Sequence, residues 1–372
     1  MLYYPHGGGI KTYIDSKRLI YRKQNINHIL IAPNFKNPGK LEKVQDGSLT
    51  TYYIPCLNIT LFGTPYSIFS SFKPVAEIVE KEKVDVIEIG DKITTLLFKN
   101  KIKKLHQYGK VKIFGFSHER ADNFAKTVIG DNVIGRFVSN LFIKRFVGAV
   151  DAILTNSDFT GSEILKHSPS DKFFVICLGI NVADFTKDKY YDQKLYNQLS
   201  ENGKKSLLVH VGRLDKDKKI DLLFDFAAAL DADKYKLVIA GGGAYENKLK
   251  NLPTVELIGY IPHEEVKKYL AVCSLGILVN DIEPYGLVGL EMMAMGLLIL
   301  GPNQGGLTTF LRPEFSWLLP HRKSDYLAAF EEWENLLEER KEKMSQAAVS
   351  QVQKYTLEKM VEQLLNVYQN HG

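Results

Sequence analysis

Short apolar runs, many of them β-branched, alternate with longer helix-like segments along most of this chain. Strands of a parallel sheet are covered on both faces, so they read as continuous apolar runs. In the first half the runs are His28–Ala32, Thr51–Ile54, Val84–Ile89, Val111–Phe116, Ala152–Thr155 and Phe173–Leu178. Helix-length segments between them include Phe69–Glu82 and Lys92–Gln107. The alternation predicts an α/β fold with parallel sheets.

The alternation stops in a polar region, residues 184–205, and then starts again. The second set of runs is Ser206–Val211, Leu237–Ala240, Val255–Ile258, Leu275–Val279 and Leu297–Leu300, and the residues from Arg322 onward are helical in pattern. With 372 residues the chain is long enough for two domains. We expect the polar region to be a loop or a boundary segment, and the two sets of runs to form two doubly wound domains. Ligands bind at the carboxyl ends of such strands, so two facing domains would form a cleft.

Composition excludes several classes of protein. The chain has 48 Lys and Arg against 43 Asp and Glu, a balance that disfavours a dedicated nucleic-acid binder. Its 3 cysteines form no CxxC pair and indicate neither a disulfide framework nor a zinc site. The longest apolar stretch, Leu287–Leu300, contains Glu291 and is shorter than the roughly 20 residues of a bilayer span. No secretion leader is visible, so we expect a cytoplasmic protein.

Three glycines precede a helix-like segment in Pro5–Tyr13, PHGGGIKTY. Glycine lets a backbone approach a phosphate or a sugar closely, and the first amides of a following helix would point at that ligand. The spacing is not that of a Walker loop, because a single residue separates Gly9 from Lys11. An ordinary tight turn explains the motif equally well.

A second motif, His210–Leu223, joins an apolar run to a helix through Gly212, Arg213 and Lys218. Arginine offers a planar fork of donors and lysine offers a point charge, and both can hold a diphosphate. The alternative is a pair of cations on a solvated surface. The order of strand, glycine and arginine favours the diphosphate.

The third motif, NDIEPYGLVGLEMMAMG, is Asn280–Gly296. Glu283 and Glu291 are about two helical turns apart, so a near-helical backbone would place both carboxylates on similar sides. Glu291 stands in an apolar helix and needs a partner, which a ribose diol would supply. A glutamate that caps its own helix or pairs with a buried lysine is the alternative.

Residues 5–13, 206–223, 237–243 and 280–306 together resemble the retaining glycosyltransferases of family 4, the glycosyl transferases group 1. GRLDKDKK resembles the family's Gly-Arg-x-x-x-x-Lys motif, and EPYGLVGLE resembles its Glu-x7-Glu motif. The resemblance implies the GT-B architecture, in which two Rossmann-like doubly wound domains face a central cleft. The implied domains are residues 1–178 on the acceptor side, 179–355 for the nucleotide-sugar donor, and a C-terminal helix, 356–372, that packs back on the first domain.

The resemblance also implies roles for single residues. Arg213 and Lys218 would hold the donor pyrophosphate, and Glu291 would bond the nucleotide ribose. Glu283 would face the transferred sugar. The main chain of three further residues would face that sugar too: Tyr285, Gly286 and Leu287.

Other donor contacts are implied outside these motifs. The main chain of Ile261, in GYIPHEEV, would meet the base, and the glycine loop would place Gly8 and Gly9 against the donor. His118, in GFSHERAD, matches the first-domain histidine near the donor sugar. An ordinary loop histidine is the alternative reading of His118.

The implied activity is transfer of a hexose from a UDP- or GDP-linked donor to a hydroxyl of a glycan or lipid-linked acceptor, with retention at the anomeric carbon. Such enzymes serve polysaccharide or glycolipid biosynthesis. Asp215 with Asp217 and Asp231 with Asp233 lie beside lysines in polar loops, so we infer no metal and no other cofactor. A nucleotide-sugar epimerase or hydrolase on the same fold, or a catalytically weak relative, are the alternatives. A nicotinamide oxidoreductase is disfavoured because no strand is followed by GxGxxG.

The chain departs from the family pattern at several positions. The family has a full apolar strand before the glycine loop, where this chain offers only Met1–Tyr4. Lys219 stands where the family mostly has glycine. Other departures are Leu298, Pro302 and the sequence GGGAY at 241–245.

Basic residues concentrate in one region of the first half. Residues 92–145 contain 12 Lys and Arg against 3 Asp and Glu. The helix-like segment Val133–Val147 mixes these cations with apolar side chains, as peripheral membrane helices do. Contact with an anionic membrane, at its inner face, is one reading. An amphipathic helix that covers the first sheet with its cations in water is the other.

Overall fold

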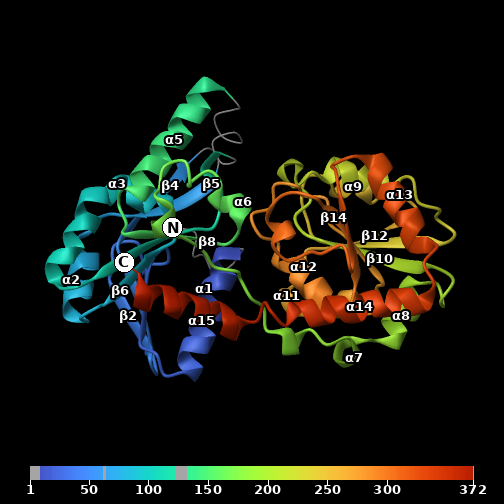
Figure 1. Cartoon of the computed structure of the whole chain (residues 1–372), viewed down its shortest axis with the longest axis horizontal. Coiled ribbons are helices and arrows are strands. Elements are labelled where there is room, and N and C mark those ends of the chain that lie inside the picture. Colours follow the sequence, from blue (N-terminus) through green and yellow to red (C-terminus); the bar gives the residue numbers. More distant parts are fainter. Residues whose placement is uncertain (1–8, 62–63, 123–131, 372) are drawn as a thin grey trace. The chain divides into compact units, whose positions relative to one another are not determined.

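The computed structural model describes residues 9–61, 64–122 and 132–371. The chain forms two compact units and passes between them twice. Unit 1 is Met1–Leu178 together with Leu357–Gly372, and unit 2 is Gly179–Thr356. Unit 1 is therefore discontinuous in sequence, and the red C-terminal helix in Figure 1 belongs with the blue and green elements.

Unit 1 contains two groups of strands and a hairpin. The first group is β1 (His28–Pro33), β2 (Glu42–Asp46) and β3 (Leu49–Ile54), in the order β1-β3-β2, with β1 parallel to β3 and β2 antiparallel to it. The second group is β6 (Val86–Ile89), β7 (Lys112–Ser117), β8 (Ala152–Thr155) and β9 (Phe173–Val175), in that order and all parallel. The antiparallel hairpin is β4 (Cys56–Leu61) and β5 (Thr64–Phe69).

Helices cover both faces of the unit 1 strands. They are α1 (Gly9–Lys23), α2 (Lys73–Lys81), α3 (Lys92–Lys103), the 3-10 helix η1 (Lys104–Tyr108), α5 (Val133–Val147), α6 (Asp158–Gly161) and α15 (Leu357–Asn370). Side chains of α1 and α15 contact Glu88 of β6, whereas Ile87 and Ile89 of β6 pack in the core cluster that includes α2. Successive strand residues point to opposite faces, so α1 and α15 lie on one face and α2 lies on the other.

Two predictions for the first half need correction. The helix predicted at Phe69–Glu82 begins only at Lys73, because Phe69 ends strand β5 and Pro74 sets the first helical turn. The segment predicted at Phe173–Leu178 is a strand only as far as Val175.

Unit 2 is built on one parallel sheet of six strands. The strands are β10 (Ser206–Val211), β11 (Tyr235–Ala240), β12 (Val255–Gly259), β13 (Leu275–Ile277), β14 (Leu298–Pro302) and β15 (Ser316–Leu319). Their order is β12-β11-β10-β13-β14-β15. The chain first moves outward from β10 in one direction and then, from β13, in the other. This reversal makes the gap between β10 and β13 the topological switch point, where doubly wound sheets bind ligands.

Helices surround the unit 2 sheet. They are α7 (Lys187–Tyr190), α8 (Gln193–Leu199), α9 (Ile220–Ala227), α10 (Glu246–Leu249), α11 (His263–Val272), α12 (Leu287–Ala294), α13 (Lys323–Glu334) and α14 (Glu338–Val352). The expectation of a loop at residues 184–205 is wrong, since α7 and α8 lie there. Asp192 caps α8 by accepting hydrogen bonds from the amides of Lys194 and Leu195, so a polar sequence still forms a helix.

Candidate active site

The switch point of unit 2 is where the two strongest sequence motifs meet. Strand β10 ends at Val211 and is followed by Gly212 and Arg213, and β13 ends at Ile277 and is followed by the loop that carries Glu283. Lys218 ends the 3-10 helix η4 (Lys216–Lys218), and a single residue, Lys219, separates it from α9. The parallel pairing of β10 with β13 places both loops at the same edge of the sheet.

The two cations of the first loop are engaged by carboxylates. Arg213 donates to Asp215 at 2.5 Å and to Asp217 at 2.9 Å. Lys218 Nζ lies 2.8 Å from Glu283 Oε2, a contact that joins the two motifs. Burial alone would lower the pKa of Arg213, but the two aspartates raise it. An anion that bound to the guanidinium or the ammonium would therefore have to displace these carboxylates.

Glu283 is fixed from its own loop as well. Asn280 Nδ2 donates to Glu283 Oε2 at 2.6 Å, and the carbonyl of Glu283 accepts from the amide of Gly306 at 2.7 Å. Gly306 permits this approach because a Cβ there would stand 2.0 Å from the carbonyl oxygen of Pro284. The loop therefore presents a carboxylate of defined position at the switch point.

The two motif glutamates do not share a helix, which corrects the near-helical backbone considered from their spacing. Helix α12 begins at Leu287, and Gly286 precedes it in the left-handed region at φ 87°. Glu283 thus lies in a loop and Glu291 lies in the helix. Tyr285 is buried, and its ring packs against Phe310.

Glu291 is the buried acid of the site. Its side chain is only 5% exposed, and its Oε1 lies 2.7 Å from His263 Nε2. Its Oε2 is buried and has no hydrogen-bond partner among the described residues. The hydrogen bond that His263 donates to Glu291 is the main reason that the pKa of His263 is raised above 6.5. A buried carboxylate oxygen without a donor is the arrangement that a ligand hydroxyl would complete.

His263 was not identified from the sequence. It opens α11, two residues after Ile261, which lies in the turn between β12 and that helix. The segment around Ile261 contains His263, but in the sequence a single histidine followed by two glutamates gives no reason to select it as a site residue. Only the fold brings it to Glu291, 28 positions further along the chain.

Two more buried polar atoms at the switch point have no hydrogen-bond partner among the described residues. His210, in β10, uses Nδ1 to contact the carbonyl of Ile277 at 2.8 Å, and its Nε2 has no partner among the described residues. Burial lowers the pKa of His210 to about 4. Asp281, in the loop after β13, receives a hydrogen bond from Gln304 on Oδ2 while Oδ1 has none in the described part of the chain. Together with Glu291 Oε2, these atoms form a group of buried polar atoms at the switch point.

The unit 1 candidates have a different setting. Gly8 lies outside the described residues, and Gly9 is the first residue of α1, with open space where a Cβ would stand. His118 follows β7, is buried, and stacks on Phe116 with ring centroids 4.2 Å apart. Burial lowers the pKa of His118 to about 3, so its imidazole is neutral.

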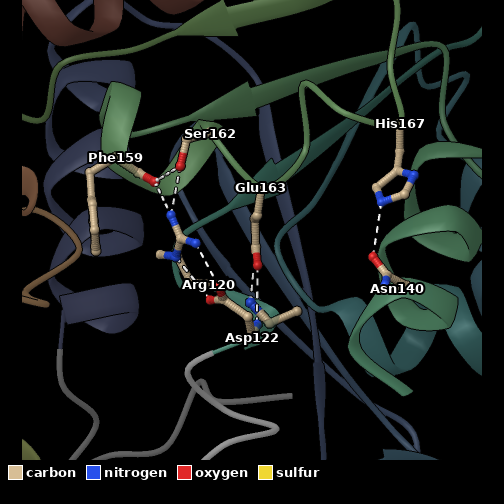
Figure 2. A network of polar contacts seen from close by, with 8 residues as sticks. Arg120, Asp122, Asn140, Phe159, Ser162, Glu163 and His167 are labelled. Atoms are coloured by element: carbon tan, nitrogen blue, oxygen red, sulfur yellow. Dashed lines mark hydrogen bonds and ion pairs between the residues drawn. The ribbon is translucent and has the colours of Figure 1, made fainter. Parts of the chain in front are cut away.

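The chain after His118 is held firmly, as Figure 2 shows. Arg120 donates to Asp122, to the carbonyl of Phe159 at 2.8 Å and to Ser162 Oγ at 2.6 Å. Glu163 accepts from the amides of residues 121 and 122 at 2.7 and 3.1 Å. Both contacts tie this loop to α6 and the turn that follows it, so the position of His118 is defined by the fold of unit 1.

Comparison with known proteins identifies the class. Residues 192–351, almost all of unit 2, match the family model described as Glycosyl transferases group 1. This segment is therefore a group 1 glycosyltransferase domain, and the resemblance of its motifs is confirmed.

Similar proteins match over both units. A GDP-mannose-dependent alpha-(1-6)-phosphatidylinositol dimannoside mannosyltransferase of Mycobacterium tuberculosis is 24% identical over 83% of this chain and 79% of its own length. An alpha-monoglucosyldiacylglycerol synthase of Streptococcus pneumoniae is 23% identical over 88% of this chain and 75% of its own. The solved sucrose-phosphate synthase of Thermosynechococcus elongatus has a TM-score of 0.76 at 17% identity, covering 98% of this chain and 93% of that one. The predicted GT-B fold is confirmed.

The described residues contain neither a helix of membrane-spanning character nor a cluster of candidate metal ligands. No helix there is long and apolar enough to cross a membrane. No group of three or more His, Cys, Asp and Glu in the same residues is placed to hold a metal ion.

Proposed function

We propose that the protein is a retaining glycosyltransferase that moves a hexose from a UDP- or GDP-linked donor to a hydroxyl of a glycan or lipid-linked acceptor, without a metal or other cofactor. The observation that carries the proposal is the Glu291 carboxylate. One of its oxygens is held by His263, and the other is buried and has no partner in the described structure. A ribose hydroxyl would donate to that oxygen, and such charge-assisted hydrogen bonds are strong.

The diphosphate would exchange with carboxylates that now neutralise the two cations. Arg213 would turn from its aspartates to the donor, and Lys218 would release Glu283. The freed Glu283 carboxylate could then accept hydrogen bonds from sugar hydroxyls. Binding of the donor diphosphate would therefore also free the Glu283 carboxylate to contact the sugar.

The reaction needs charge stabilisation more than a nucleophile. The acceptor hydroxyl oxygen bonds to the anomeric carbon, and the bond from that carbon to the phosphate oxygen breaks on the same face. The hydroxyl proton passes to an oxygen of the leaving diphosphate. Arg213, Lys218 and the first amides of α12 would stabilise the departing charge. We propose that the neutral imidazole of His118 contributes a hydrogen bond near the donor sugar, and that the main chain of Ile261 meets the base.

The names of the two relatives support a lipid-linked acceptor. One is named for a phosphatidylinositol dimannoside and the other for a monoglucosyldiacylglycerol. In both, the sugar is carried by a lipid. We extend this class of acceptor to the present chain as part of the proposal.

Calorimetry with UDP and GDP tests the donor site. Arg213→Ala, Lys218→Ala and Glu291→Ala should each weaken the preferred nucleotide by roughly ten- to a hundredfold, the effect of losing a charge-assisted hydrogen bond. Lys216→Ala, one turn away and exposed, is the matched control and should bind like the parent. Unchanged affinity in all three site variants would overturn the proposal.

Turnover distinguishes Glu283 from the binding residues. Glu283→Ala should reduce hexose transfer far more than UDP or GDP affinity, because its carboxylate would contact the sugar and not the nucleotide.

Product analysis, with and without acceptor, accompanies this measurement. A donor that is epimerised or hydrolysed at the same rate with and without acceptor would indicate the alternative enzyme class.

Helix α5 suggests how a lipid-linked acceptor is approached. Four large apolar side chains of this helix are exposed: Val133 by 75%, Ile134 by 66%, Phe137 by 69% and Leu141 by 42%. Arg136, Lys144 and Arg145 are exposed on the same helix, which stands out from the strands of its unit in Figure 1. We propose that this apolar and basic surface rests on an anionic membrane.

Liposome co-sedimentation tests this contact. The protein should bind vesicles that contain phosphatidylglycerol better than phosphatidylcholine vesicles, and binding should fall as salt rises. Phe137→Ser should reduce binding several-fold, since about 0.8 kcal/mol is lost for each buried CH2 removed from the bilayer. Leu337→Ser, at a residue 77% exposed in unit 2, is the matched control. Equal binding by both variants would rule out α5 as the contact.

A further inference from the structure

A buried lysine on helix α11 takes no part in the donor contacts proposed above. The side chain of Lys267 is only 3% exposed, and its Nζ lies 2.7 Å from Glu264 Oε2. Burial alone would lower the pKa of Lys267, but the hydrogen bond to Glu264 raises it, so the side chain is charged. Desolvation offsets much of the attraction in a buried ion pair, so such pairs add little to stability. Stability alone therefore does not explain a cation at this position.

Two aromatic rings enclose the Lys267 ammonium group. Its Nζ lies 5.0 Å from the ring centroid of Phe185 and 5.5 Å from that of Tyr190. Both distances are within the range of cation–π attraction, which is stronger for a desolvated cation. Phe185 follows the 3-10 helix η3 (Val182–Asp184), and Tyr190 ends α7. The lysine thus attaches the segment by which the chain enters unit 2 to helix α11.

Phe185 also contacts the histidine that holds Glu291. The ring centroids of Phe185 and His263 are 6.0 Å apart, and the rings meet edge to face at 60°. Lys267 is four positions after His263, so both side chains project from the same face of α11. Phe185 is only 4% exposed. Its buried ring therefore restricts His263 on one side, while Glu291 Oε1 holds His263 Nε2 at 2.7 Å.

The main chain of Phe185 is fixed by the turn that precedes it. Asn181 Nδ2 donates to Asp184 Oδ2 at 2.8 Å, and the amide of Phe185 donates to the carbonyl of Val182 at 3.0 Å. The Phe185 ring is therefore supported by a hydrogen-bonded turn on one side and by the Lys267 cation on the other.

We propose that Phe185 and Lys267 are positioning residues for the nucleotide ribose, which act through His263 on Glu291. The inference deepens the proposed function and rests on it, because Glu291 is there the acceptor for a ribose hydroxyl. Lys267 keeps the Phe185 ring against His263, and His263 holds one Glu291 oxygen and leaves the other for the ligand. Without this support Glu291 keeps its charge but loses its fixed direction. A hydrogen bond weakens steeply when its angle bends, so the ribose contact is lost.

A positioning role and a purely structural role lead to different losses of affinity. If the cluster only stabilises unit 2, its removal affects every ligand of the donor site alike. If it positions Glu291, its removal affects only ligands that carry the ribose hydroxyl bound by Glu291. A thermodynamic cycle of protein variants against ribonucleotides and deoxyribonucleotides separates the two roles.

The test measures by calorimetry how the full chain binds UDP, GDP and their 2′-deoxy and 3′-deoxy analogues. The parent should bind its preferred ribonucleotide roughly tenfold more tightly than the analogue that lacks the bonded hydroxyl. Phe185→Leu and Lys267→Met should each weaken the ribonucleotide several-fold and leave that analogue within about twofold, so the ratio of the two affinities falls toward one. His263→Leu should lower the ratio in the same way. His263→Gln keeps a donor for Glu291 and should restore most of it.

Lys268→Met is the matched control for Lys267→Met. Lys268 is the next residue of α11, is about half exposed and pairs with Glu265, so its loss should leave every affinity unchanged. Lys267→Met should keep the fold, because the Glu264 that it leaves behind is 75% exposed and can be solvated. Thermal melting of each variant verifies that unit 2 is folded.

Three outcomes would overturn the inference. If the ratio were unchanged in Phe185→Leu and Lys267→Met but lost in Glu291→Ala, the positioning role would be wrong and the proposed donor site would stand. Equal weakening of ribonucleotides and deoxyribonucleotides would show that the cluster only supports the fold of unit 2. A parent that binds neither nucleotide, or a ratio that Glu291→Ala does not change, would overturn the proposed donor site and this inference with it.

Discussion

His263 and Glu291 form a pair in which a partly exposed imidazole supports a buried carboxylate. The imidazole holds one carboxylate oxygen and leaves the other for a ligand. If His263 is protonated, the pair is a charge-assisted hydrogen bond in a site that is partly shielded from water. The strength of this pair should therefore depend on pH.

We expect His263 to stabilise unit 2 in acid and to lose that effect in base. Its folded pKa is raised above 6.5, so the stabilisation is complete below the unfolded pKa and disappears as pH rises through the folded one. His263→Gln should lower the free energy of unfolding at about pH 6 and change it little at about pH 9. His167→Gln is the opposite control, because burial lowers the pKa of His167. A His263 effect that grows with pH would contradict the assignment.

At the scale of elements, strands with uninterrupted apolar sequences were predictable. Ala152–Thr155, Ser206–Val211 and the helix Val133–Val147 have the predicted bounds, because burial on one or both sides dictates their pattern. The sequence does not indicate the antiparallel β4–β5 hairpin, because its strands carry no uninterrupted apolar run, or β15, which is a four-residue strand at the edge of the parallel sheet. Helix α8 was missed because a capping aspartate, and not an apolar face, starts it.

The candidate site was predictable as motifs but not as contacts. Arg213, Lys218, Glu283 and Glu291 were identified by residue type and spacing. The ion pair between Lys218 and Glu283 joins positions 65 residues apart, and nothing local in the sequence indicates it. Only the adjacency of β10 and β13 in the sheet brings these two loops together.

Lys219, one of the departures from the family pattern, has a structural cost at the junction of η4 and α9. It adopts the left-handed conformation at φ 59° and ψ 33°. That conformation costs a non-glycine residue about 1–2 kcal/mol. Glycine would avoid this cost. Its greater conformational freedom in the unfolded chain would, however, lower the free energy of unfolding by about 0.5–1 kcal/mol.

Lys219→Gly should therefore stabilise unit 2 by about 0.5–1 kcal/mol. Chemical denaturation, followed by a signal from unit 2, measures the change in the free energy of unfolding. Lys219→Ala removes the same charge but keeps a Cβ in the left-handed region, so it should give no gain. Stabilisation by alanine equal to that by glycine would assign the effect to charge instead of backbone conformation.

At the scale of the whole molecule, the last helix belongs to the unit in which the chain starts. Helix α15 buries Leu357, Met360, Val361 and Leu364 in unit 1, and its Tyr368 hydroxyl donates to Glu88. Full burial of an apolar side chain contributes about 1.5–3 kcal/mol. Four such residues contribute roughly 6–12 kcal/mol, about the whole stability of a typical domain.

Truncation after Thr356 should therefore unfold unit 1 and leave unit 2 intact. Hydrogen exchange should lose the protection of β7 and keep that of β10, and calorimetry should still detect binding of UDP or GDP to unit 2. Tyr368→Phe is the graded control: it removes one hydrogen bond to Glu88, so unit 1 should lose only about 1–3 kcal/mol. Protection of β7 in the truncated chain would show that α15 is dispensable. If the truncated chain lost both the protection of β7 and nucleotide binding, the donor site would depend on unit 1. The contacts within unit 2 do not require such a dependence.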